Sequence, residues 1–65
     1  MKAIVTKVYP LRMENIEGVE YFVVDIETDL IKGDKKIMFQ SDTLYFTNKE
    51  DANKIIVGYE FEVEE

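Results

Sequence analysis

Three carboxylates alternate along one stretch of the sequence, at Asp25, Glu27 and Asp29. Alternate residues of a strand point to the same face, so these side chains could gather around a hard cation such as calcium. The chain has no glycine-anchored acidic loop of the EF-hand type, which holds such ligands in many proteins. We therefore interpret the three acids as a solvated strand end, whose charge discourages pairing between sheet edges.

Nucleophilic catalysis needs a nucleophile beside a base, and the sequence offers little for either role. Ser41 is the single serine, and both histidine and cysteine are absent. Carboxylates could do acid–base chemistry in a concave pocket, but a barrel of this size fills its interior with its own side chains. The sequence predicts a non-enzymatic protein with no cofactor, no metal and no small-molecule substrate.

A basic cluster, Lys32, Lys35 and Lys36, surrounds Gly33-Asp34, and Tyr21 and Tyr45 are expected to face outward. Small barrels bind single-stranded nucleic acid by stacking bases on exposed aromatic rings beside a basic groove. The formal net charge of −6 opposes approach to a phosphate backbone. Single-stranded nucleic-acid binding is therefore the alternative function rather than the leading one.

A row of glutamates, Glu60, Glu62 and Glu64, falls on one side of the last predicted strand. Such a row could meet a basic partner or imitate phosphates toward a DNA-binding protein. It could equally be a charged edge that protects the strand from aggregation. An acidic decoy of a DNA-binding protein is the third functional hypothesis.

The length of 65 residues predicts one domain, residues 1–65, near the lower limit for a self-sufficient core. A hydrophobic content of 46% is that of a globular chain. Without cysteine there can be no disulfide framework. The N-terminal stretch has no apolar run long enough for a signal peptide or a membrane span, so we expect a cytoplasmic protein and no membrane partner.

Apolar and β-branched runs predict strands separated by turn residues. The expected strands are residues 2–13 with a bend at Pro10, residues 19–28, residues 35–40, residues 44–47 and a closing strand after Gly58. Tyr59, Phe61 and Val63 should share the buried face of that closing strand. Turns are expected at residues 14–18, at residues 32–34 and at Ser41-Asp42-Thr43. Thr47 and Glu50 form a capping-box pattern for a helical turn before the last strand.

This order favours an all-β fold with one short helical turn, and in particular a small five-stranded SH3-like barrel. SH3-like barrels carry a helical turn directly before the last strand, whereas OB-folds place the helix between strands three and four. The OB-fold barrel is the alternative, and it would need residues 43–47 to be helical. The ending Val57-Gly58-Tyr59-Glu60-Phe61-Glu62-Val63 is shared by many barrels of both types and identifies no family.

Four apolar residues lie opposite the predicted core parity, namely Tyr21, Val23, Met38 and Tyr45. An apolar patch of this kind on a monomer indicates an interaction surface. The leading hypothesis is therefore a protein–protein interaction adaptor or accessory subunit. Its partner would be a protein, either a second copy of this chain or another polypeptide.

Overall fold

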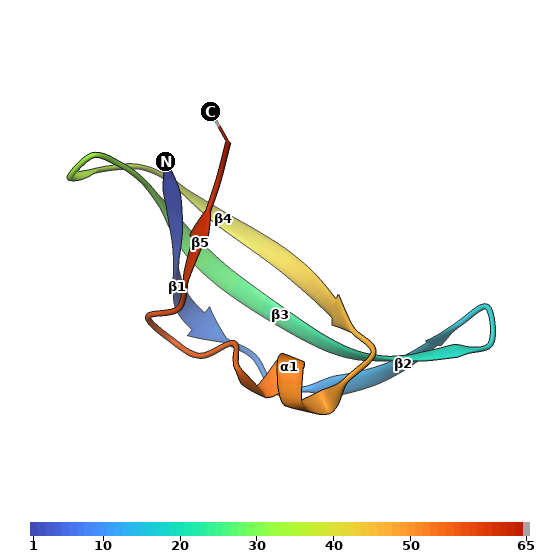
Figure 1. The fold of residues 1–65 in the computed structure, drawn as a ribbon. Helices are drawn as coiled ribbons and strands as arrows, with labels where there is room; N and C mark the ends of the chain where they lie inside the picture. Colours follow the sequence, from blue (N-terminus) through green and yellow to red (C-terminus); the bar gives the residue numbers. More distant parts are fainter. Residues whose placement is uncertain (65) are drawn as a thin grey trace.

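The computed structural model describes residues 1–64 and folds them as a curled antiparallel sheet with one short helix (Figure 1). In chain order the elements are β1 (Lys2–Val8), β2 (Arg12–Ile16), β3 (Val19–Lys32), β4 (Lys35–Phe46), α1 (Lys49–Asn53) and β5 (Glu60–Glu62). The predicted small all-β fold is confirmed, as is the position of the helix directly before the last strand.

β3 is the central strand of this sheet. β4 pairs with one edge of β3 from Phe22 to Lys32, while β2 and β1 share the other edge, β2 first and β1 after it. β5 pairs with the far side of β1. The sheet curls so that β4 forms one margin and β5 and β2 form the other, and within residues 1–64 β4 does not pair with either of them (Figure 1). The fold is therefore a half-barrel.

Alternation along β3 defines the core. Val24, Ile26, Thr28 and Leu30 share one parity and are each less than 5% exposed. We call the side of the sheet that these residues occupy the inner face, and the opposite side the outer face. α1 covers part of the inner face, since Ala52 belongs to the same buried cluster as Val24 and Ile26.

The chain enters β5 through a glycine in a left-handed conformation, as the sequence predicts. Gly58 has φ of +94°, where a Cβ atom would be strained. Its amide donates a hydrogen bond to the carbonyl oxygen of Val5 at 2.8 Å, and the amide of Val5 donates to the carbonyl oxygen of Tyr59 at 2.9 Å. These two bonds attach the closing segment to β1.

The predicted first strand, residues 2–13, is in fact two strands. β1 ends at Val8, and β2 begins at Arg12 after a break around Pro10. A proline has no amide hydrogen to give to a ladder, so pairing stops there. The break lets β1 and β2 pair with different lengths of the same β3 edge.

The predicted turn at Ser41-Asp42-Thr43 is wrong, and so is the separate strand at residues 44–47. β4 runs without interruption from Lys35 to Phe46, with Ser41 opposite Glu27 and Thr43 opposite Asp25. Short polar side chains favour turns when the backbone has no other partner. Here β3 extends to Lys32 and supplies hydrogen-bond partners along the whole of β4, which overrides the local preference.

Two details at the C-terminal end also differ from expectation. The helix N-cap is Asn48 rather than Thr47, and its side chain accepts a hydrogen bond from the amide of Glu50 at 2.8 Å. Tyr59 precedes the short strand β5 and is 40% exposed, so it does not pack in the core as predicted. Its ring instead lies against that of Phe61, with centroids 4.8 Å apart.

A matched pair of isoleucines tests the position of the core. Replacing Ile26 by Val should lower the free energy of unfolding by about 1 kcal/mol, because the lost methylene leaves a gap in a site only 2% exposed. The same change at Ile56, which is 62% exposed, should change it by less than about 0.5 kcal/mol. Urea denaturation measures both, and equal losses would contradict this assignment of the core.

Candidate functional site

β4 has one edge that no other described strand covers. Eleven of its twelve residues, all except Ile37, pair with β3 on one side, and the first eight, Lys35 to Asp42, are all exposed. An uncovered strand presents a row of backbone amide and carbonyl groups that can pair with another strand. The uncovered side of β4 is called the free edge of β4 below.

The opposite margin of the sheet, formed by β5 and the five-residue strand β2, is built differently. β5 is only three residues long, and two of them, Glu60 and Glu62, are exposed carboxylates. Short length and charge are two of the devices by which proteins prevent strand edges from pairing. Residues 38–46 of β4 contain neither lysine nor proline, and the irregularity in its ladder lies near its start, between Leu30 and Ile31 of β3.

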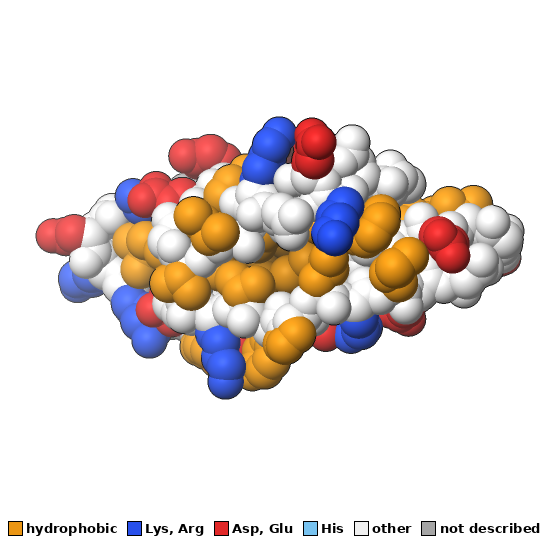
Figure 2. Space-filling model, turned by 90° about the horizontal axis from the view of Figure 1, so that it is seen from below, with side chains coloured by type: hydrophobic (Ala, Val, Ile, Leu, Met, Phe, Trp, Pro, Cys, Tyr) orange, Lys and Arg blue, Asp and Glu red, His pale blue; other side chains and the backbone are white. Residues whose placement is uncertain are grey.

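β4 also carries large apolar side chains in solvent. Ile37, Met38, Phe39 and Tyr45 are each about half exposed. Seen from below Figure 1, on the side of α1, the molecule also shows a band of hydrophobic side chains along its middle, with charged side chains around it (Figure 2). Apolar area of this kind on a small domain indicates a surface that another molecule covers.

The predicted interaction surface needs correction. Residues directly opposite each other in an antiparallel pair lie on one face, and Tyr45 is opposite Val23 whereas Met38 is opposite Leu30. Tyr21, Val23 and Tyr45 therefore lie on the outer face and Met38 on the inner face. Val23 is fully buried, so it contributes nothing to an exposed surface.

The two tyrosines of that prediction do form a unit. The rings of Tyr21 and Tyr45 lie 6.0 Å apart with an angle of 88° between their planes, the edge-to-face arrangement that aromatic quadrupoles favour. Val23 lies directly between Tyr45 of β4 and Arg12 of β2 in the register, and Tyr21 is two residues from Val23 along β3. The pair thus helps to cover Val23 on the outer face.

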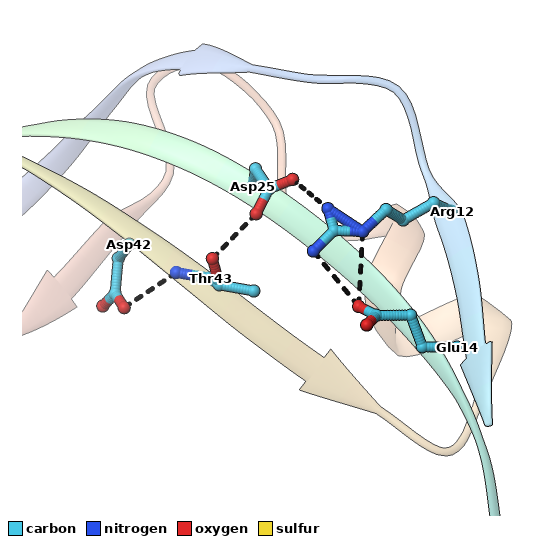
Figure 3. Close-up of polar contacts among 5 residues, drawn as sticks. All are labelled: Arg12, Glu14, Asp25, Asp42 and Thr43. Carbon is cyan, nitrogen blue, oxygen red and sulfur yellow. Dashed lines mark hydrogen bonds and ion pairs between the residues drawn. The ribbon is translucent and has the colours of Figure 1, made fainter. Parts of the chain in front are cut away.

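Asp25 joins three strands on the outer face (Figure 3). Its carboxylate forms an ion pair with Arg12 of β2 and accepts a hydrogen bond of 2.7 Å from the hydroxyl of Thr43 on β4. Arg12 also lies 3.1 Å from the carboxylate of Glu14. The sequence did not reveal this network, because Arg12, Asp25 and Thr43 are far apart in the chain and only the strand register brings them together.

The other two carboxylates of the acidic stretch have donors of their own. Glu27 accepts a hydrogen bond from the hydroxyl of Tyr9, and Asp29 lies 3.1 Å from the ammonium group of Lys36. Within residues 1–64 no group of three acidic side chains is placed to hold a metal ion. The acids thus share a face, as predicted, but each is engaged separately instead of converging on one point.

A hollow of about 360 Å³ lies beside this network. It is lined by Tyr9, Asp25, Ile26, Glu27, Ser41, Asp42 and Thr43. Carboxylates and hydroxyls dominate the lining, so the hollow suits a hydrogen-bond donor or a cation far better than a phosphate.

The basic and aromatic parts of the predicted nucleic-acid patch lie far apart along β3. Lys32 ends β3 and Tyr21 stands near its start, which separates them by roughly 36 Å at ~3.3 Å per residue. Lys35 lies opposite Lys32 in the hairpin, and Lys36 is the partner of Asp29. The basic and aromatic halves of the patch are thus not side by side.

The predicted acidic edge is present in part. Glu60 and Glu62 lie on β5 with Phe61 between them, and Glu64 lies beyond the end of the strand. The carboxylate of Glu60 is 3.2 Å from the ammonium group of Lys2, which neutralises part of the row. No described helix has the length and apolar composition required to cross a membrane.

Comparison of this chain with protein-family models, curated proteins and solved structures found no match.

The Asp25 network should contribute a modest part of the stability. Asp25→Asn keeps the acceptor for Thr43 but removes the charge opposite Arg12, so the free energy of unfolding should fall by about 0.5–1 kcal/mol. Glu20→Gln is the control, because Glu20 is an exposed carboxylate on the same strand. Urea denaturation measures both variants, and a loss no larger than that of the control would show that the network adds nothing.

Proposed function

We propose that this chain is a non-enzymatic protein-interaction module that binds an extended polypeptide segment along the free edge of β4. The observation that supports this most strongly is an uncovered strand of twelve residues with exposed apolar side chains on both faces. Addition of a strand to such an edge uses backbone hydrogen bonds for affinity and alternate side-chain contacts for selectivity.

The contrast between the two margins supports the same proposal. The β5 margin is short and acidic, whereas the β4 margin is long and has few charges after Lys36. An edge of this kind that is left uncovered is an aggregation hazard, and proteins normally blunt it. A partner strand would remove the hazard and bury Phe39, which is 52% exposed, and Met38, which is 49% exposed.

Selection of peptides from a displayed random library tests the proposal. Enriched peptides should alternate apolar residues, and their binding should shift the backbone amide resonances of residues 38–46. Phe39→Asp should weaken binding about tenfold, because it places a charge within the contact. Ile56→Asp is the matched control, since Ile56 is an exposed apolar residue that lies outside β4, and it should leave the affinity unchanged.

Two results would contradict the proposal. One is enrichment of peptides whose binding shifts amides of β5 or α1 while those of β4 stay unchanged. The other is an equal loss of affinity in the Phe39 and Ile56 variants, which would indicate nonspecific apolar contact.

Single-stranded nucleic-acid binding has less support. Its basic residues and its tyrosines lie at opposite ends of β3, and the acidic hollow of Asp25, Glu27 and Asp42 lies along the sheet between them. A bound strand would have to pass carboxylates that repel its phosphates. The acidic-decoy function has less support still, because Lys2 neutralises Glu60 and few carboxylates remain in the row.

An amide NMR titration with a mixed pool of short single-stranded oligonucleotides at low salt tests the nucleic-acid-binding function. We expect no shifts at Tyr21, at Tyr45 or from Lys32 to Lys36, because the two groups cannot form one basic aromatic groove. Shifts at both groups that disappear on addition of salt would favour the nucleic-acid function instead.

A further inference from the structure

We infer that the segment on the free edge of β4 is β4 of a second copy of this chain, paired antiparallel about a two-fold axis at Ser41. This inference rests on the proposed function and gives it a partner. Two features of the free edge support this choice of partner. One is the charge of β4, and the other is the way its side chains match when β4 pairs with β4 of a second copy.

The charge of β4 favours a second copy. The chain carries a net charge of −6, so two copies repel each other over most of their surfaces. Residues 38–44 of β4 contain one charged side chain, that of Asp42, so the segment that would pair adds little to this repulsion. The β5 margin would instead set exposed glutamates against glutamates. Two copies can therefore approach at β4 with the least electrostatic cost.

The side-chain pattern selects one register. In a symmetric antiparallel pair with the axis at Ser41, Gln40 faces Asp42 of the second copy and Met38 faces its Leu44. Directly opposite side chains lie about 5 Å apart, so an amide meets a carboxylate and an apolar residue meets an apolar residue. All four residues are on the inner face, opposite Thr28, Ile26, Leu30 and Val24 of β3.

Neighbouring registers match poorly. With the axis at Asp42, the two Asp42 carboxylates face each other, and like charges in that position are destabilising. With the axis at Gln40, Met38 faces Asp42. With the axis at Phe39, the pairing runs through the irregularity at Ile37, which is the extra residue of β4 between Lys36 and Met38. Only the register at Ser41 keeps residues 38–44 regular and complementary.

The polar residues at the centre of this register are available for it. The side chain of Gln40 is exposed and forms no hydrogen bond with other described residues. One carboxylate oxygen of Asp42 accepts from the amide of Thr43 at 2.8 Å, which leaves the other oxygen for the amide of Gln40 in the second copy. The symmetric pair would contain two such contacts.

Sedimentation equilibrium with charge variants of Gln40 tests the inference. The unmodified chain should form a dimer in a concentration-dependent manner. Gln40→Glu places two carboxylates opposite each other at two symmetric positions and should raise the dimer dissociation constant at least about tenfold. Gln40→Lys creates two ion pairs with Asp42 and should leave the constant equal or lower.

Two controls for net charge and one double variant make the test specific for this register. Asn53→Glu and Asn53→Lys change the net charge identically at an exposed helix position, and both should stay within about twofold of the unmodified chain. The double variant Gln40→Glu with Asp42→Lys restores opposite charges across the axis and should dimerise again. Circular dichroism confirms that each variant is folded.

Each other outcome overturns the inference. A chain that stays monomeric at millimolar concentration has no self-pairing, and peptide binding at β4 would then show that the proposed function survives without it. A dimer that responds alike to Glu and Lys at position 40, or that the double variant fails to rescue, uses a different register or surface.

Discussion

The pairing of β3 with its neighbours on both edges is the interaction on which the rest of the structure depends. Its fourteen residues supply one continuous template, with β4 along one edge and β2 and β1 in succession along the other. Its inner parity supplies Val24, Ile26, Thr28 and Leu30 to the core. A chain of this size has little apolar surface to bury. The single long strand β3 both pairs with its neighbours and contributes side chains to the core.

The outer face is stabilised by a different kind of contact. Asp25 links Arg12 of β2 to Thr43 of β4, and the Tyr21–Tyr45 pair covers Val23. These contacts bridge the strands on the side that α1 does not cover. Asp25, Glu27 and Asp29 each bind a donor or a cation from another strand or from the β1–β2 connection, and these interactions stabilise the outer face.

The parts of the sheet that the fold leaves uncovered support the proposed function. A closed barrel would join its two margins, but here β4 and β5 stay apart within the described residues. One margin is short and acidic, and the other is long and apolar. This asymmetry gives the molecule one edge suited to pairing. A second copy in the Ser41 register would extend the sheet across the two-fold axis and cover Met38 and Phe39.

The sequence by itself determined the features that depend on local chemistry. Gly33 and Gly58 marked a turn and a left-handed position, Pro10 marked a bend or an edge, and alternating residues marked most of β3 as a strand. The position of the helical turn before the last strand followed from the same kind of signal. These predictions held because each depends on the conformational limits of one residue or on a period of two.

Only the tertiary structure decided which residues pair and which face is covered. The Ser41-Asp42-Thr43 segment has turn chemistry, yet it is a strand because β3 is long enough to pair with it. Met38 and Val23 were predicted to share an exposed surface. The strand register instead places Met38 on the inner face, and Val23 is buried on the outer face. Phe39 is exposed because β4 is a margin of the sheet. Which strands pair, and which strand becomes a margin of the sheet, depends on contacts between distant parts of the chain, and the pattern within a single strand does not specify them.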